Sequence, residues 1–313
     1  MDYVLTITCL IVAGIILAVS LNLVQGYGGV VSVSHGASMG VGAYVAGVLS
    51  TNYGLDTSWT MIVGALVAGA VGWLFMSVAA RLDPDDFILA SFAFQMVVID
   101  LIAQWTPVTG GNQGLFGIER PEYFGVKLTN LPLFTAFVLG VGLASWLVHA
   151  HISRAGYGLI LRGIRESSRS VEAAGKDAFH TQVVTFAVAN GFAGLAGGIV
   201  ATTIGLITPG DFNIQRSILV VAFLLVGGMG NMTGAVLGTV ALMALPEMVK
   251  QFVTVPNQWQ GPGQQIVYGV IIVLFVWFRP QGIIPERPVY LVHRQLRRLR
   301  RGGSGGVKEA RAA

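Results

Sequence analysis

The chain has 313 residues, of which 54% are hydrophobic and only 11% are charged, and its mean hydropathy is +0.70. A soluble domain carries roughly a quarter charged residues, because its surface has to face water. The composition therefore excludes a water-soluble enzyme or binding domain and indicates a protein that crosses a membrane several times. The net charge of +4 does not indicate nucleic-acid binding, since much of the basic charge lies near the C-terminus.

Nine apolar segments follow one another along the chain. They are residues 3–24, 30–50, 58–80, 87–106, 131–149, 181–206, 214–229, 233–250 and 264–279. At 1.5 Å per residue, a helix of about 20 residues crosses a hydrocarbon layer roughly 30 Å thick. The segment 214–229 is short and runs into Gly227-Gly228-Met229-Gly230, which predicts a half-helix or part of a re-entrant pair. We expect an all-α polytopic membrane protein with eight to nine transmembrane segments.

Lys and Arg residues concentrate in the segment 150–180 and in the C-terminal tail. Basic loops stay in the cytoplasm, so both segments are expected on that side of the membrane. The loop 107–130 is then expected outside and the turn 81–86 inside, with the N-terminus outside if every segment crosses. We divide the chain into a membrane domain, residues 1–285, and a basic, Gly-rich cytoplasmic tail, residues 286–313.

The segment 150–180 has the pattern of a short amphipathic helix that ends in a turn at Gly175. Its apolar ridge consists of Leu161, Ile164, Ser168 and Val171, and its charged flank consists of Arg162, Arg165, Glu166 and Arg169. A helix with an apolar ridge and a charged flank can dock into a cleft of a partner protein. The alternative is a solvated basic loop that only fixes the orientation of the chain.

Several motifs, met in order along the chain, resemble those of one transporter family. They are Leu21-Asn22-Leu23-Val24-Gln25-Gly26-Tyr27-Gly28-Gly29, the stretch Ser32 to Tyr44, Thr109-Gly110-Gly111-Asn112-Gln113-Gly114-Leu115, and Phe278-Arg279-Pro280-Gln281-Gly282. Together they resemble the M-type permease subunits of branched-chain amino acid ABC transporters. Glu172-Ala173-Ala174-Gly175 is similar to the EAA motif with which ABC-importer permeases engage their ATPase. Ser34 departs from the glycine usual in the family, and Asp100 stands near a position where the family often has Glu.

The resemblance implies a bundle like that of type II ABC importers, with broken or re-entrant helices, in the bacterial cytoplasmic membrane. It implies ATP-driven import of branched-chain or related amino acids, together with a homologous H-type permease, two ATPase subunits and an extracytoplasmic solute-binding protein. The resemblance implies that the chain itself is a transport subunit, not an enzyme, and holds no cofactor. It lacks the GxxxxGK[ST] phosphate-binding motif, so ATP and Mg²⁺ would bind the ATPase subunits. The residues expected to couple to the ATPase are Arg162, Arg165, Glu166, Arg169, Glu172, Ala173, Ala174 and Gly175.

Polar residues inside apolar segments provide a second group of candidates. Ser34, His35, Gly36 and Asp100 are expected at a helix break or along the translocation pathway. A polar group in lipid needs a partner or a water-lined cavity, so Asp100 must face protein or water. The alternative for His35 is a bond to a neighbouring backbone carbonyl. No metal site is expected there, because no His or carboxylate lies three or four residues beyond His35.

Thr109, Gly110, Gly111 and Asn112 are expected to contact the solute-binding protein, the alternative being an ordinary outer turn. Gly191, Gly194, Gly197 and Gly198 predict a close-packing helix face, or the lining of a broken helix. An ion-coupled secondary transporter or channel for a small polar solute is the alternative function. That mechanism would use several intramembrane carboxylates, for which Asp100 is the clear candidate. An intramembrane enzyme would need a convergent nucleophile or metal set, and the sequence provides neither.

Overall fold

The structure, a computed structural model, describes residues 2–123, 126–127, 130–154 and 156–252, with short pieces at 263, 269–270, 273, 277 and 282–286. Its helices are α1 (Asp2–Leu21), α2 (His35–Tyr53), α3 (Thr57–Ala79), α4 (Pro84–Gln104), α5 (Thr106–Thr109), α6 (Leu131–Arg154), α7 (Gly156–Ala173), α8 (Ala178–Ile204), α9 (Ile214–Gly227) and α10 (Met232–Phe252). The π-helix η1 (Asn22–Tyr27) extends α1, and the 3₁₀-helices η2 (Gly111–Gln113) and η3 (Pro209–Phe212) lie in loops. Two-residue strands pair antiparallel, β1 (Leu115–Phe116) with β4 (Leu206–Ile207) and β2 (Glu122–Tyr123) with β3 (Val126–Lys127). The described chain is therefore helical apart from these short pairs, as expected.

Within the described residues, six segments are long and apolar enough to cross a membrane. They are Asp2–Tyr27, Thr57–Ala79, Pro84–Gln104, Leu131–Arg154, Ala178–Ile204 and Pro209–Gly227. The predicted segments match helices to within a few residues, except that the second helix begins at His35 rather than at 30, because residues 28–34 are not helical. The predicted segment 264–279 and the tail after Glu286 lie outside the part of the chain that the structure describes. The expected total of eight to nine crossings stays a prediction.

Local sequence signals explain where the helices begin and end. The Asp56 carboxylate accepts a hydrogen bond of 2.9 Å from the Ser58 amide at the start of α3, and the Asp177 carboxylate accepts one of 2.8 Å from the His180 amide at the start of α8. These carboxylates satisfy amides that the first helical turn leaves without partners. Pro84 takes the first position of α4, where its missing N–H costs nothing. Gly205 ends α8 with a φ of 75°, a backbone angle that glycine adopts without strain.

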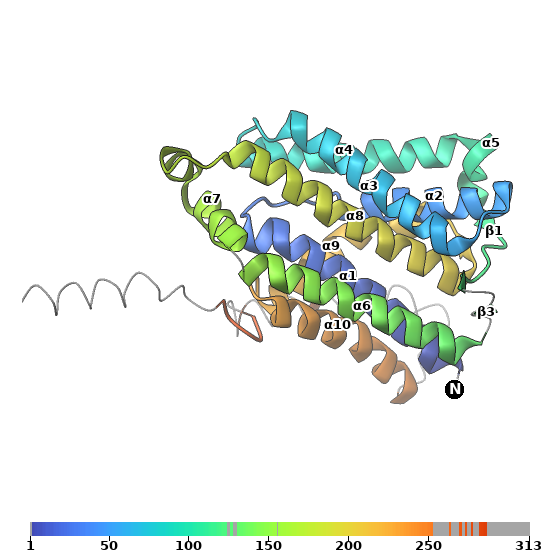
Figure 1. Cartoon of the computed structure of the whole chain (residues 1–313). Helices are drawn as coiled ribbons and strands as arrows, with labels where there is room; N and C mark the ends of the chain where they lie inside the picture. The colour runs from blue at the N-terminus through green and yellow to red at the C-terminus, as the bar shows by residue number, and fades with distance from the viewer. Residues whose placement is uncertain are drawn as a thin grey trace, which may run out of the picture.

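The helices run side by side, so their connections gather at two ends of the bundle (Figure 1). At one end the Thr57 hydroxyl donates to the Glu119 carbonyl at 3.0 Å, and the Gly117 amide donates to the Gly205 carbonyl at 3.1 Å. At the other end lie α7 and the turn between α3 and α4, where Arg81 lies over the ring of Phe179. We call these the outer and inner ends, after the orientation expected from the basic residues. The loop 107–130 and the turn 81–86 thus lie at opposite ends, as predicted.

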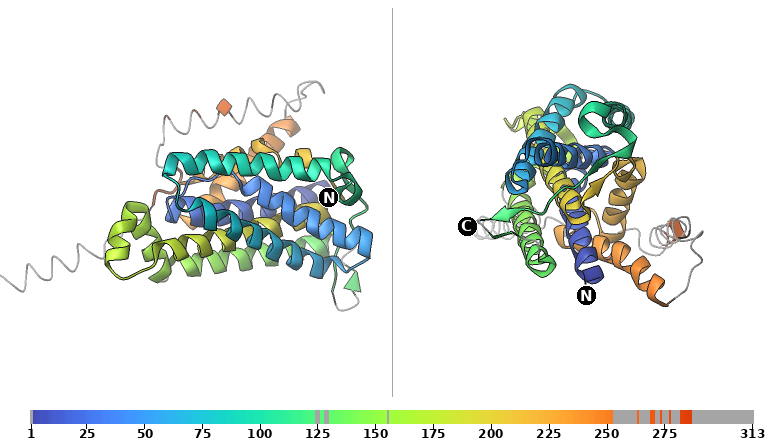
Figure 2. Two further views of the ribbon diagram at one scale, coloured as in Figure 1. Left: turned by 90° about the horizontal axis from the view of Figure 1, so that it is seen from above. Right: turned by 90° about the vertical axis from the view of Figure 1, so that its right-hand side faces the viewer.

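The centre of the bundle is α8, which packs on α1, α2 and α3 (Figures 1 and 2). Small residues allow this close packing. A methyl group added to Gly194 would collide with Ala68, and one added to Gly197 would collide with the Met39 carbonyl. Close approach of helix backbones replaces the hydrophobic effect as the source of helix association in lipid. The packing face predicted on α8 is therefore confirmed.

Candidate functional site

The polar segment after α6 forms α7 at the inner end, and α7 has two parts. Ser167 has extended backbone angles, φ −166° and ψ 106°, which divide the helix there. The Ser170 amide donates to the Ser167 hydroxyl at 3.3 Å, so Ser167 caps the second part. The second part folds back, and Val171 lies 2.8 Å from where a methyl group on Gly163 would stand. The predicted amphipathic helix and its turn at Gly175 are present, but the helix is not continuous.

The first part of α7 is fixed to α8 by Tyr157. Its hydroxyl donates to the Thr181 carbonyl at 3.0 Å and lies 2.8 Å from the Thr185 hydroxyl. Burial raises the pKa of Tyr157, so the phenol keeps the proton that it donates. On the same part, Leu161 and Ile164 are buried, in agreement with the predicted apolar ridge.

Two arginines of α7, Arg162 and Arg165, bind other residues of the same chain. Arg165 donates to the Gly26 carbonyl at 2.6 Å and to the Glu286 carboxylate at 2.9 Å. The Nε of Arg162 lies 3.3 Å from the other Glu286 oxygen, and its guanidinium lies 4.9 Å from the ring centre of Tyr27. We call Arg162, Arg165 and Glu286 the inner ion-pair cluster. Their bonds within the chain hold α7 in place. The contact with an ATPase that the sequence predicted for both arginines stays a prediction.

The remaining predicted coupling residues lie on the surface. Arg169, Glu172, Ala173, Ala174 and Gly175 are exposed, and the Glu166 side chain is 79% exposed. Gly175 has a φ of 76°, which lets the chain turn sharply toward α8. The second part of α7 and this turn therefore form the accessible surface of the segment. Their contact with an ATPase stays a prediction.

The start of α2 lies inside the bundle and is held by side chains from two other helices. The Gly36 amide donates to the Ser217 hydroxyl of α9 at 2.8 Å, and the Ala37 amide donates to Gln95 Oε1 of α4 at 2.6 Å. Gln95 also donates to the Phe212 carbonyl at 2.7 Å and accepts from Ser217 at 3.1 Å. A first helical turn needs partners for its amides, and here α4 and α9 provide them in place of water. The structure thus places a helix start at Ser34–Gly36, where the sequence predicted a helix break.

His35 is fully buried at this helix start. Neither ring nitrogen has a hydrogen-bond partner among the described residues, and the ring meets that of Phe186 edge-on with 6.3 Å between centres. The bond to a neighbouring carbonyl that we considered is therefore not made within the described part of the chain. The described residues also contain no group of three or more His, Cys, Asp or Glu side chains that could hold a metal.

Asp100 lies apart from Ser34, His35 and Gly36, with which the sequence-based prediction grouped it. It is exposed on α4, whereas Gln95 of the same helix is buried and reaches the start of α2. The two residues are five positions apart, which is about 1.4 helical turns, so they face different directions. Gln95 was not among the predicted site residues, although an amide within an apolar span is a signal of the same kind as a carboxylate there.

At the outer end, the predicted contact residues are only partly accessible. Thr109 is buried and donates to the Ile102 and Trp105 carbonyls at 2.6 and 2.9 Å, and Gly111 is buried as well. Asn112 is exposed. The predicted segment therefore includes an ordinary structural turn, and Asn112 is its most accessible predicted residue. A contact with a solute-binding protein stays a prediction.

A polar groove of about 920 Å³ lies beside this loop at the outer end. Its lining includes Ser50, Asp56, Phe116, Glu119 and Glu122. Burial alone would raise the pKa of Asp56, but hydrogen bonds from Ser58 and from the Glu122 amide lower it below its ordinary value. The carboxylate is thus negatively charged at neutral pH.

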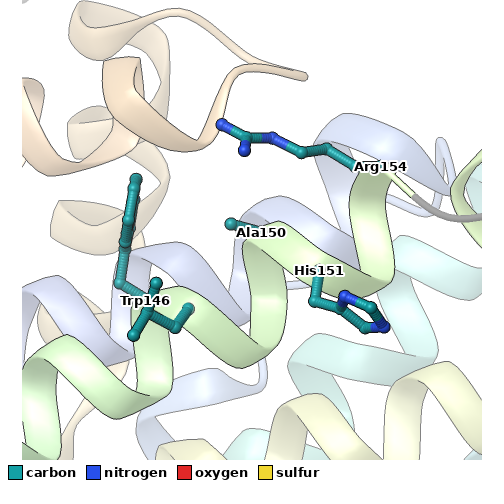
Figure 3. Close-up of a pocket in the computed structure, with 5 residues that line it drawn as sticks. Trp146, Ala150, His151 and Arg154 are labelled. Atoms are coloured by element: carbon teal, nitrogen blue, oxygen red, sulfur yellow. The ribbon is translucent and has the colours of Figure 1, made fainter.

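A second hollow, of about 550 Å³, lies along the inner half of α6 (Figure 3). Trp146, Ala150 and Arg154 are four residues apart and face the same side of α6, whereas His151 points away from them. The hollow is largely apolar and has one guanidinium at its edge. None of the predicted site residues lines it, so we do not assign it to the transport pathway.

Comparison with known proteins places the chain in a family. Residues 3–276 match the family described as branched-chain amino acid transport system / permease component. The chain belongs to this permease family. It is 26% identical over 296 residues to the high-affinity branched-chain amino acid transport system permease protein LivM of Escherichia coli strain K12, covering 87% of this chain and 67% of the relative. No solved structure shows significant similarity.

Two relatives from a second organism, one of each permease type, are also similar to this chain. The chain is 23% identical over 247 residues to the probable branched-chain amino acid transport permease protein LivM of Methanocaldococcus jannaschii, covering 73% of this chain and 68% of the relative. It is 23% identical over 299 residues to the probable LivH permease of the same organism, covering 91% of each chain. The resemblance to the M-type permeases is thereby confirmed, and the chain is a multi-pass transport subunit rather than an enzyme.

Proposed function

We propose that the chain is the M-type permease of an ATP-driven importer that takes up branched-chain or related amino acids from a solute-binding protein. The observation that carries this proposal is the exposed second part of α7, which is presented at the inner end by a helix fixed to the rest of the bundle. The amino acids are released to the permease at the outer end, near Asn112 and the polar groove. The importer lies in the bacterial cytoplasmic membrane.

The proposed complex contains this permease, a homologous H-type permease, two ATPase subunits and the binding protein. Similarity of the chain to both a LivM and a LivH protein supports a pairing of two related permeases. ATP and Mg²⁺ bind the ATPase subunits. When the ATPase dimer closes, it moves α7, and the two permeases switch between inward-facing and outward-facing states.

An ion-coupled secondary transporter is the rival. Such a protein carries buried carboxylates that bind the coupling ion within the membrane. The buried polar side chains of the described residues are those of Ser, Thr, Asn, Gln and His, without any carboxylate. Asp100, the candidate expected from the sequence, is exposed. These observations favour coupling to ATP.

The first test reverses the exposed charges on the second part of α7. We expect Arg169→Glu with Glu172→Lys to abolish copurification of the ATPase and uptake of radiolabelled leucine, because both charges would oppose those of the partner surface. Arg81→Glu with Asp85→Lys reverses two exposed charges at the same end, one in the turn after α3 and one in the first turn of α4, and serves as the control. Retention of ATPase and uptake in the Arg169/Glu172 variant would contradict the docking of α7.

A further inference from the structure

The chain connects α7 directly to only two helices. The preceding helix is α6 and the following helix is α8, so a force on α7 reaches both through the backbone. The inner ends of α1 and α9 are not chain neighbours of α7. Any movement shared with them has to pass through side-chain contacts.

Arg165 provides the contact to the end of α1. Besides its bond to the Gly26 carbonyl, its Cβ lies 3.0 Å from where a methyl group on Gly29 would stand. Gly29 also has a φ of 73°, a backbone angle that residues with a side chain rarely adopt. A side chain at this position is therefore disfavoured both by the backbone angle and by the contact with Arg165. The end of α1 is the π-helix η1, a geometry that is rare and concentrated at functional sites. Arg165 therefore rests directly on the segment where α1 departs from regular helix.

Glu286 provides the contact to the end of α9. Its segment is bound to that end by two backbone hydrogen bonds, from Ile283 to the Val226 carbonyl at 2.8 Å and from Ile284 to the Gly227 carbonyl at 3.1 Å. The Glu286 carboxyl carbon lies 2.8 Å from where a methyl group on Gly230 would stand. The carboxylate is thus held at the turn between α9 and α10.

Asn22 adds a direct contact between the end of α1 and the end of α9. Its side chain accepts a hydrogen bond of 2.9 Å from the Gly230 amide, which joins η1 to the turn between α9 and α10. The side chains of Arg162, Arg165 and Glu286 are 23%, 28% and 26% exposed. An ion pair that is largely shielded from water is screened less by salt than a surface pair. Removing only one of its two partners is costly, because the other charge is left without a partner. The nearby Glu166 is a weaker partner, because it lies 3.8 Å from Arg165 and is largely exposed.

We propose that Glu286 is a positioning residue that joins α7 to the inner ends of α1 and α9, so that these three elements move together when α7 is displaced. The inference rests on the proposed function, since it assigns to this cluster the transfer of movement from the ATPase to the permease. Neutralising Glu286 leaves two arginines without their carboxylate and frees α7 from the turn between α9 and α10. The ATPase can then move α7 without moving the inner end of α9.

The test compares ATP consumption with transport in the full complex reconstituted in proteoliposomes. We expect Glu286→Gln to retain ATP hydrolysis stimulated by the loaded binding protein, but to lower amino acid uptake per ATP by roughly fivefold or more, the range of a typical coupling free energy. Asp85→Asn, which removes an exposed carboxylate at the same end of the bundle, should leave this ratio unchanged. An unchanged ratio in Glu286→Gln would overturn the proposal.

A cross-link distinguishes a role of Glu286 in transferring movement from α7 to α9 from a role in folding alone. Arg162→Cys with Glu286→Cys, in a Cys9→Ala background, removes two of the three charges of the inner ion-pair cluster and introduces two thiols that a short bifunctional thiosulfonate reagent can join. We expect low uptake per ATP before cross-linking and recovery afterwards in the same preparation. Failure of the cross-linked protein to recover would also overturn the proposal, even if Glu286→Gln failed to assemble.

Hydrogen exchange of the purified chain gives a readout that needs no transport. Glu286→Gln should accelerate amide exchange in residues 156–166 and leave the outer loop 111–118 unchanged. Equal exchange in both proteins would show that Glu286 does not hold α7. If instead the wild-type complex neither contains an ATPase nor takes up amino acids, the proposed function fails, whatever Glu286 does.

Discussion

Gln95 shows how one side chain can organise three helices within the membrane bundle. It binds the first turn of α2, the carbonyl of Phe212 before α9, and the hydroxyl of Ser217 on α9. Its own helix, α4, is thereby tied to the start of α2. A sequence shows that an amide lies in an apolar span, but its partners lie 58, 117 and 122 positions away. Periodicity within one helix cannot pair residues at such separations.

Replacement of Gln95 by leucine tests this arrangement. Gln95→Leu keeps the size of the side chain but leaves the Ala37 amide and the Phe212 carbonyl without their partner. A buried polar group left unpaired costs about 2 kcal/mol, so we expect a clearly lower Tm of the purified protein in detergent. Gln104→Leu changes the same residue type at an exposed position of α4 and should leave the Tm unchanged. Equal Tm values for both variants would contradict the role of Gln95.

At the scale of elements, the sequence predicts which segments are helices better than it predicts their interruptions. The apolar segments and the terminal signals at Asp56, Pro84 and Asp177 account for the spans, because each signal acts within one helical turn. The non-helical residues 28–34 and the break at Ser167 depend on packing between distant segments. Of the arginines on α7, the sequence could not separate Arg165 from Arg169, because Glu286 lies 121 positions from Arg165.

Ser167 provides the prediction at this scale. Ser167→Ala removes the hydroxyl that accepts from the Ser170 amide, and loss of such a cap costs about 1 kcal/mol. We expect faster hydrogen exchange of amides 168–174 and weaker binding of the ATPase, since the exposed surface of α7 lies in this second part. Ser167→Asp keeps a capping oxygen and should exchange at the wild-type rate. Slow exchange in Ser167→Ala would mean that Val171 packing alone holds the second part.

At the scale of the molecule, the six candidate spans differ in how much of each is covered by the rest of the chain. Within an 18-residue apolar stretch of each span, the share of buried residues is 67% in α8 and 22% in α4, the lowest value of the six. The exposed side of α4 is apolar, with Leu89, Phe92, Val97 and Leu101 on it. Asp100 is exposed on the same helix. A carboxylate that faces lipid is costly, so its side of α4 is expected to meet protein or water.

Because α4 is the least covered span and carries a charge, we expect the second permease of the importer to cover its exposed side at Asp100. In a Cys9→Ala background, Asp100→Cys should react with a membrane-impermeant maleimide in the chain alone and be protected in the assembled pair of permeases. Asn112→Cys, in the outer loop, should react in both and controls for access of the reagent. Asp100 lies four residues before the end of α4, close to the outer surface, so the reagent can reach it in the chain alone. Protection in the assembled pair would therefore show contact with the other permease. Equal labelling of Asp100→Cys in the chain alone and in the pair would mean that this carboxylate faces water at the outer membrane surface and that the second permease binds another helix.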